Sequence, residues 1–185
     1  MGPGRQKVIL TGFMATGKSR VGSAVAQRLG LRFIDTDQEI ENRCGKSPAA
    51  IIVEDGEPRL RELERGLVAE LAADPAPAVV ATGGGTLVEP GNFEAMAAVG
   101  VVIWLRARPE VVAARVAQCS QVRPKLTESG APLLEAIEDL MARRQAAYAR
   151  AEVNVDTSDL SIEDVVNAVL AALERAGRNP CKALT

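Results

Sequence analysis

Residues 12–19 read Gly-Phe-Met-Ala-Thr-Gly-Lys-Ser and match the pattern G-x-x-x-x-G-K-S/T. The two glycines let the backbone curl, so that successive N–H groups point at one anion. Lys18 can then place a cation on the β- and γ-phosphates of a nucleotide, and the Ser19 hydroxyl can ligate Mg²⁺. Such a loop requires a strand before it and a helix after it, which the apolar patterns at 8–11 and 19–29 supply. The segment predicts a site for a nucleotide with Mg²⁺.

A pair of carboxylates follows the second predicted strand, at 32–34. Ligand sites of parallel sheets lie at the carboxyl ends of the strands, so Asp35 and Asp37 are candidates for chemistry. One carboxylate can support the Mg²⁺ shell while the other faces the hydroxyl group of an acceptor. The alternative is that these residues cap the helix predicted at 36–44, and capping is compatible with either task.

Three consecutive glycines, Gly83, Gly84 and Gly85, follow the third predicted strand at 78–82. Without side chains they leave bare backbone that a ligand can approach closely. A flexible turn is the alternative. A position at the carboxyl end of a strand, opposite the phosphate loop, nevertheless favours a ligand site.

Arginines on two predicted helices are candidates for gripping an anion. Arg61 lies in the first turns of the helix predicted at 58–73, and Arg143 and Arg144 lie in a later helix. A guanidinium can fork onto a carboxylate with two parallel hydrogen bonds. Spacing alone leaves alternatives open, because Arg61 can pair with Glu64 within its own helix and the other two can be ordinary surface charges.

The bulk composition limits the classes of function. The chain has 185 residues, of which 47% are hydrophobic, which is enough for one domain with a full core. A net charge of −2 argues against nucleic-acid binding as the main role, since that calls for a basic face. No apolar run approaches the ~18 residues that span a bilayer, and the three cysteines are widely spaced. We therefore expect a cytoplasmic protein without nucleic-acid or membrane partners.

The sequence contains no histidine. This absence removes the usual general base, imidazole metal ligands and Ser-His-Asp chemistry. Acid–base work must then fall to carboxylates or lysines. Phosphoryl transfer suits that restriction, because it depends mainly on positioning and on charge stabilisation.

Short apolar runs alternate with helical patterns along the chain, which predicts an α/β fold with a parallel sheet covered on both faces. The expected strands are 8–11, 32–34, 78–82, 101–105 and 153–156, and the expected helices are 19–29, 36–44, 49–54, 58–73, 92–98, 110–118, 133–151 and 162–176. We expect a single domain over 1–185, with its core at about 6–176 and a frayed tail at 177–185.

The polar segment at 118–132 interrupts this rhythm, since it contains two prolines and separates two helices. Long segments without regular structure in compact domains are commonly lids or binding loops. Arg123 and Lys125 put two cations there. A cationic lid that closes over a nucleotide excludes water and stabilises charge. A solvated loop with incidental charges is the alternative.

Taken in order, the motifs resemble those of the shikimate kinase family over residues 6–175: Gly-Phe-Met-x-x-Gly-Lys-Ser, Phe-Ile-Asp-Thr-Asp, Gly-Glu-x-x-x-Arg-x-x-Glu, Ala-Thr-Gly-Gly-Gly, Arg-Pro-x-Leu and Arg-x-x-x-Tyr. The Asp-Thr-Asp and Gly-Gly-Gly elements are far more specific than the phosphate loop. The resemblance implies a three-layer α/β/α P-loop NTPase fold of the nucleoside-monophosphate-kinase type, with a five-stranded parallel sheet in the order 2-3-1-4-5 and a mobile lid. It also implies a monomer that transfers the γ-phosphate of ATP to the 3-hydroxyl of shikimate, giving shikimate 3-phosphate and ADP, in chorismate and aromatic amino-acid biosynthesis.

The resemblance also implies roles for individual residues. The implied catalytic residues are Lys18, Asp37 as the candidate base, and Arg123 as the lid arginine that reaches the phosphates. The implied ATP-binding residues are Gly12, Met14, Ala15, Thr16, Gly17, Lys18, Ser19, Arg20, Arg115 and Arg123, with Arg115 matching an adenine-stacking arginine when one residue is gapped. The implied shikimate-binding residues are Asp37, Arg61, Gly83, Gly84, Gly85 and Arg144, and the implied Mg²⁺ site is formed by Ser19 and Asp35.

Four positions depart from the family pattern without removing a catalytic group. Arg20 stands where the family usually has Thr, and Lys125 where the lid usually has Leu. Ile52 and Leu60 stand where the family often has Phe. Two alternatives therefore stay open. The aliphatic pair favours a diverged kinase for another small hydroxy acid, and Arg20 with the altered lid favours a nucleotide-binding module without turnover.

Overall fold

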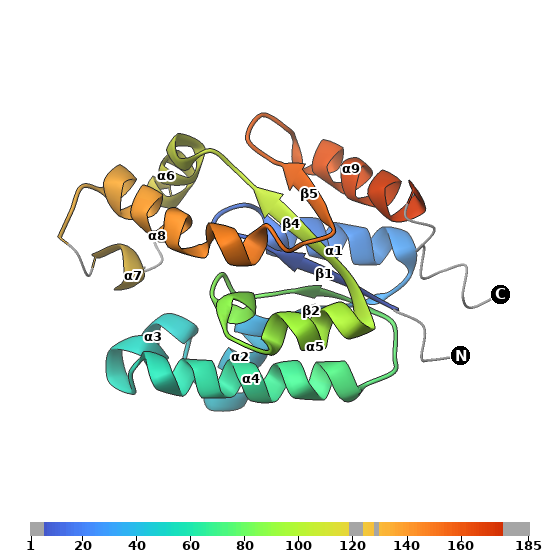
Figure 1. Ribbon diagram of the computed structural model, residues 1–185, viewed down its shortest axis with the longest axis horizontal. Coiled ribbons are helices and arrows are strands. Elements are labelled where there is room, and N and C mark those ends of the chain that lie inside the picture. The colour runs from blue at the N-terminus through green and yellow to red at the C-terminus, as the bar shows by residue number, and fades with distance from the viewer. Residues whose placement is uncertain (1–5, 119–123, 128–129, 176–185) are drawn as a thin grey trace.

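The computed structural model describes residues 6–118, 124–127 and 130–175, and Figure 1 shows a twisted sheet between two layers of helices. Within these residues the sheet has five strands in the order β2-β3-β1-β4-β5. Every neighbouring pair is parallel. The strands are β1 (Lys7–Thr11), β2 (Arg32–Asp35), β3 (Ala78–Ala81), β4 (Gly100–Arg106) and β5 (Val153–Asp156). The predicted strand order and the layered α/β architecture are confirmed.

Two apolar clusters cover the two faces of the sheet. One contains Val25 of α1 (Lys18–Leu29) and Val169 of α9 (Ile162–Arg175), together with Val8 of β1. The other joins Ile9 of β1 to helices α2 (Thr36–Cys44), α3 (Pro48–Glu54), α4 (Glu57–Ala73) and α5 (Asn92–Val99). Because both faces are covered, every residue of β1 is buried and its sequence shows no polar alternation.

A third apolar cluster connects the phosphate loop to the remaining helices. Phe13 of the loop packs with residues of α6 (Pro109–Ala117), α7 (Pro124–Thr127) and α8 (Leu133–Tyr148). Its members include Leu126 of α7 and Ile137 of α8, both buried. These helices are therefore anchored on the side of the sheet from which the phosphate loop emerges.

Local capping explains several of the helix boundaries. The helix α1 ends at Gly30, whose φ of 64° is left-handed and whose N–H donates to the carbonyl oxygen of Ala26. The Ser47 hydroxyl accepts a hydrogen bond from the backbone N–H of Ala50, so α3 begins at Pro48, slightly earlier than predicted. Two other bounds also differ from the prediction: α4 begins at Glu57, and the helix predicted at 133–151 ends earlier, at Tyr148.

Part of the predicted lid has regular structure, which corrects the expectation for 118–132. The short helix α7 occupies residues Pro124–Thr127, and Leu126 is buried in the third cluster. Proline fits the first turn of a helix, and the cover that Leu126 finds is a tertiary contact that the local pattern does not reveal. Arg123 and the tail at 177–185 lie outside the described residues. None of the described helices is long and apolar enough to cross a membrane.

Candidate active site

The phosphate loop turns between β1 and α1 with positive φ at three residues: 139° at Gly12, 60° at Ala15 and 93° at Gly17. At Gly12, a Cβ atom would also overlap the carbonyl oxygen of Leu105 on β4, so only glycine fits. Ala15 holds a conformation that side-chain-bearing residues rarely adopt. Backbone of this kind is typical of ligand-binding loops, because it turns successive N–H groups toward one point.

Lys18 folds back over the loop. Its Nζ donates to the carbonyl oxygens of Gly12 at 2.9 Å and Phe13 at 2.8 Å. The Thr16 hydroxyl donates to the same Phe13 oxygen at 2.8 Å. The helix α1 begins at Lys18, so its first N–H groups also open toward the loop. The ammonium group and the helix end together form a positive site for an anion.

Ser19 and Asp35 meet at the edge of this loop. The Ser19 hydroxyl donates to Asp35 Oδ2 at 2.5 Å, and Asp35 Oδ1 accepts from the backbone N–H of Asp37 at 3.1 Å. Asp35 therefore caps α2 and faces the loop at the same time. Among the described residues there is no cluster of three or more His, Cys, Asp or Glu that could hold a metal ion. A hydroxyl and one carboxylate fit Mg²⁺, which keeps several waters and takes phosphate oxygens as further ligands.

Three carboxylates surround the guanidinium of Arg61. Its NH1 group donates to Glu64 Oε2 at 2.5 Å, its NH2 group donates to Glu57 Oε1 at 2.6 Å, and its Nε is 3.5 Å from Glu89 Oε1. Its side chain is 11% exposed. Burial opposes the charge of this guanidinium, but the Glu64 and Glu57 carboxylates outweigh burial and hold the pKa of Arg61 above its ordinary value. The intrahelical pairing left open by the sequence is thus present, and it fixes the guanidinium in place.

The glycine triplet brings the candidate residues together. A Cβ on Gly83 would overlap Asp37 Oδ1, and a Cβ on Gly85 would overlap the guanidinium of Arg61. The missing side chains therefore make room for these two residues of the site. The backbone N–H of Gly83 donates to the Thr36 hydroxyl at 2.8 Å, which ties the triplet to the start of α2.

Gly84 links α8 to the phosphate loop. A Cβ there would lie 3.3 Å from NH1 of Arg144 and 3.6 Å from the Gly12 carbonyl oxygen. The Tyr148 hydroxyl donates to the Gly84 carbonyl oxygen at 2.5 Å. Burial raises the pKa of the Tyr148 phenol, so this group remains a donor at neutral pH. Arg144 is buried, and its guanidinium lies 5.9 Å from the centre of the Phe13 ring.

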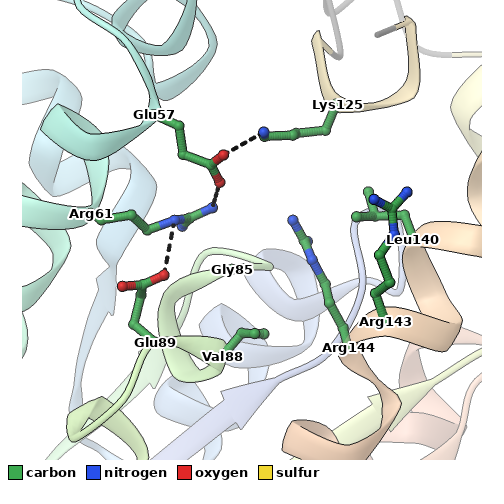
Figure 2. Close-up of a pocket in the computed structure, with 9 residues that line it drawn as sticks. All are labelled: Glu57, Arg61, Gly85, Val88, Glu89, Lys125, Leu140, Arg143 and Arg144. Atoms are coloured by element: carbon green, nitrogen blue, oxygen red, sulfur yellow. Dashed lines mark hydrogen bonds and ion pairs between the residues drawn. The ribbon is translucent and has the colours of Figure 1, made fainter. Parts of the chain in front are cut away.

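A cavity of about 240 Å³ opens among α4, α7, α8 and the short 3₁₀ helix η1 (Thr86–Val88) (Figure 2). It is lined by Glu57, Arg61, Gly85, Val88, Glu89, Lys125, Leu140, Arg143 and Arg144. Figure 2 shows Arg61 and Arg144 on different walls of the cavity, with Lys125 pointing toward Glu57. Arg143 and Arg144 both line the cavity, but Arg144 is buried whereas Arg143 is exposed.

Two further arginines of the predicted nucleotide-binding set are described by the structure, Arg115 and Arg20. Arg115 NH1 donates to the Ala15 carbonyl oxygen at 3.3 Å, and its NH2 donates to that of Thr157 at 2.7 Å. Its guanidinium therefore ties the phosphate loop to the segment after β5. Arg20 is exposed on α1, and nothing in the structure explains arginine at this position.

No role is predicted from the sequence for Glu57, Thr86 or Glu89, although Glu57 is part of the Gly-Glu-x-x-x-Arg-x-x-Glu motif. Glu57 and Glu89 contact Arg61 directly, and Thr86 acts through Glu64. Glu57 lies one helical turn before Arg61 on α4, a spacing that could have indicated the contact. The Thr86 hydroxyl donates to the buried Glu64 at 2.6 Å, and Glu89 follows η1. Thr86 and Glu89 contact residues of α4 only because the tertiary fold brings the two segments together, and no local sequence pattern predicts these contacts.

Comparison with known proteins decides the family. The family model described as shikimate kinase matches residues 14–174. The chain belongs to the shikimate kinase family. Among curated relatives, the shikimate kinase of Geobacter sulfurreducens is 42% identical over 164 residues, which covers 89% of this chain and 88% of the relative. The resemblance seen in the sequence motifs is thereby confirmed.

Solved structures of family members are similar over nearly the whole length. The shikimate kinase of Bacteroides thetaiotaomicron has a TM-score of 0.82 and 32% identity, covering 91% of this chain and 98% of that one. The shikimate kinase of Acinetobacter baumannii, in complex with shikimate, has a TM-score of 0.85 and 28% identity, covering 92% of this chain and 94% of that one. The predicted P-loop kinase fold and the predicted class of enzyme, an ATP-dependent kinase, are confirmed for this family member.

Proposed function

We propose that this chain transfers the γ-phosphate of ATP to the 3-hydroxyl of shikimate, giving shikimate 3-phosphate and ADP, as a step of chorismate and aromatic amino-acid biosynthesis. One observation carries the proposal. The space that side chains at 83, 84 and 85 would enter is bordered in turn by the Asp37 carboxylate, the Arg144 guanidinium and the Arg61 guanidinium. A clamp for a carboxylate, an acceptor for a hydroxyl proton and a phosphate site therefore adjoin one strip of backbone.

The acceptor side of the proposal follows from the chemistry of shikimate, a small anion with three hydroxyl groups. Arg61 and Arg144 line one cavity and can hold its carboxylate with directed hydrogen bonds. Asp37 then accepts a proton from the reacting hydroxyl. A carboxylate is a weak base, but a loose transition state needs little deprotonation before the phosphoryl group moves.

The nucleotide side is assigned to the phosphate loop. Lys18 and the first N–H groups of α1 would hold the β- and γ-phosphates, and Ser19 with Asp35 would hold Mg²⁺. When bound, Mg²⁺ neutralises charge on the phosphate oxygens. Arg115 lies beside the loop, and its assignment as an adenine-stacking arginine stays a prediction. The role of Arg123 at the phosphates stays a prediction.

Two of the departures from the family pattern bear on the acceptor. Leu60 is buried in the core cluster under the sheet face, and Ile52 packs against the same cluster. The residues that line the described cavity do not include either of them. The aliphatic side chains of Ile52 and Leu60 therefore give little support to the alternative of a kinase for another hydroxy acid.

A turnover assay tests the proposal. Purified protein is mixed with Mg-ATP and a panel of hydroxy acids, ADP release is followed, and the phosphorylated carbon is identified by NMR. We expect strong turnover with shikimate and phosphate on the 3-hydroxyl. Turnover with another acid and none with shikimate would overturn the assignment, and ATP binding without turnover would point to a nucleotide-binding module.

A further inference from the structure

The charges around Arg61 pose a problem for an anionic acceptor. One guanidinium lies within ion-pair distance of three carboxylates, those of Glu57, Glu64 and Glu89. If Arg61 alone balanced all three, the local charge would be negative and would repel the carboxylate of shikimate. A clamp for an anion therefore needs further cations that neutralise these partners.

Two of the three carboxylates have a second cation. Glu89 Oε2 lies 3.6 Å from Arg65 NH1, and Glu57 Oε2 lies 2.5 Å from Lys125 Nζ. Only Glu64 is then left, among the described residues, as a carboxylate that Arg61 alone balances. With Arg65 and Lys125 included, three cations balance the three carboxylates around Arg61.

Lys125 is the more consequential of these two cations. It lines the cavity, whereas Arg65 does not line it, and its side chain is 20% exposed, against 51% for Arg65. Partial burial reduces screening by water and salt, so this pair is stronger than a fully exposed one. The neighbouring Leu126 is buried in the third apolar cluster, which holds α7 where Lys125 reaches Glu57.

The two cations on Glu57 keep its carboxyl group ionised. Its two oxygens are divided between two cations: Oε1 accepts from Arg61 at 2.6 Å and Oε2 from Lys125 at 2.5 Å. Burial alone would raise the pKa of Glu57, but the hydrogen bonds from Lys125 and Arg61 outweigh it, and the pKa lies below its ordinary value. Glu57 is thus ionised at neutral pH, and its charge must be compensated whenever an anion enters the cavity.

We propose that Lys125 is a positioning residue that makes the acceptor site selective for a carboxylate, because it neutralises Glu57 and leaves Arg61 available, with Arg144, for the anion. The inference rests on the proposed function, since it takes the Arg61–Arg144 clamp as the carboxylate site. It also explains lysine at the position where the family pattern usually has leucine: here the lid contributes a charge to the acceptor site.

The first test compares charge variants of Lys125. We expect Lys125→Leu to raise the KM for shikimate about tenfold while kcat and the KM for ATP stay within about twofold, as for a lost binding contribution that is equal in ground and transition states. Lys125→Arg keeps the charge and should retain the wild-type KM. The matched control is Lys46→Leu, because Lys46 pairs with Glu54 at 2.9 Å and Asp55 at 3.0 Å outside the cavity. An unchanged shikimate KM in Lys125→Leu would overturn the proposal.

A second variant separates charge compensation from simple attachment of α7. Adding Glu57→Gln to Lys125→Leu removes the uncompensated carboxylate while its amide oxygen can still accept from Arg61. We expect the double variant to recover a KM within about threefold of wild type. If Lys125 acted only by fastening α7 to α4, the double variant would stay as impaired as Lys125→Leu, and the inference would fail.

The acceptor itself supplies a third readout. The methyl ester of shikimate has no charge, so its KM should be high in the wild type and nearly the same in Lys125→Leu. An equal rise for acid and ester would contradict the proposal. Binding of the acid can also be followed without turnover through Trp104, the single tryptophan, whose ring lies 5.8 Å from that of Tyr148. Wild-type turnover of shikimate tests the proposed function, whereas the acid–ester comparison among variants tests Lys125.

Discussion

Each oxygen of the Asp35 carboxylate has a different task. Oδ2 accepts from the Ser19 hydroxyl, and Oδ1 accepts from backbone N–H groups at the start of α2. Capping requires only a side-chain oxygen, which asparagine supplies as well as aspartate. Holding Mg²⁺ favours the negative charge. The two tasks can therefore be separated by substitution.

Asp35→Asn should keep the cap and lose the metal site. We expect the free energy of unfolding to stay within about 0.5 kcal/mol of wild type, while turnover falls by roughly a hundredfold or more. Asp35→Ala should lose about 1 kcal/mol of stability as well. Urea unfolding and ADP release over a Mg²⁺ titration measure the two effects. Full turnover in Asp35→Asn would show that the capping role is sufficient.

Asp37 is the residue whose chemistry the proposed reaction needs most. Its carboxylate packs against Gly83, so an isosteric amide fits the same space. Asp37→Asn should lower kcat by about 10²–10⁴-fold, the contribution typical of a general base, with little change in ATP affinity. Single-turnover kinetics and nucleotide titration measure these quantities. A kcat close to wild type would remove Asp37 from its assigned role.

At the scale of elements, glycines on neighbouring segments have opposite surroundings. A Cβ on Gly85, at the start of η1, would overlap the Arg61 guanidinium, whereas a Cβ on Gly66 of α4 would have no heavy atom within 4 Å. The first glycine makes room for a functional side chain. The second is exposed within a helix, where glycine costs backbone entropy.

Alanine substitutions should reveal this difference. Gly66→Ala should stabilise the protein by about 0.5–1 kcal/mol and leave the shikimate KM unchanged. Gly85→Ala should displace the flexible end of Arg61, raising the shikimate KM by about tenfold or more with a small change in stability. Urea midpoints and steady-state kinetics of the two variants form the comparison. Equal KM values would mean that Arg61 need not occupy its position against Gly85.

Much of the element pattern was predictable because it is local. The apolar runs that became the central strands β1, β3 and β4 are almost wholly buried, and the helices follow from periodicity and from caps such as Ser47 and Gly30. Asp37 and the glycine triplet were predictable as candidates because ligand sites gather at the carboxyl ends of strands. Spacing alone left Arg61 and Arg144 open, and the family resemblance supplied their roles. Asp37, Arg61 and Arg144 do reach one strip of backbone at 83–85.

The contacts that support those residues were not predictable. The pair between Glu57 and Lys125 joins segments 68 residues apart, and the Thr86–Glu64 hydrogen bond joins segments 22 residues apart. Periodicity describes neighbours along the chain and contains no information on such pairs. The helix α7 was missed for the same reason, because its burial depends on the cluster that Leu126 enters.

At the scale of the whole molecule, ion pairs tie together segments that are distant in sequence. They include Arg32 with Asp74, Arg150 with Glu94, and Arg108 with Asp159. The pKa of Asp74 is lowered by a backbone N–H and by Arg32, that of Glu94 mainly by Arg150, and that of Asp159 mainly by Arg108. A carboxyl group whose pKa is lower in the folded state stabilises the fold at pH values above its ordinary, unfolded-state pKa. That contribution is lost as the pH falls through the folded-state pKa.

The pH dependence of stability should therefore be confined to acid. The ordinary pKa values of these groups are 3.8 for the aspartates and 4.5 for Glu94, so their contribution is complete at neutral pH and declines below those values. The chain has no histidine, the one side chain whose ordinary pKa lies in the range of about 5–8. We expect the urea midpoint to be constant between about pH 8 and 5.5 and to fall below about pH 4.5. Glu94→Gln should shrink the acid loss without altering the neutral plateau's shape. A decline of the urea midpoint between about pH 8 and 6 would reveal a titrating group with a strongly shifted pKa. It would contradict the prediction that only these carboxyl groups set the pH dependence.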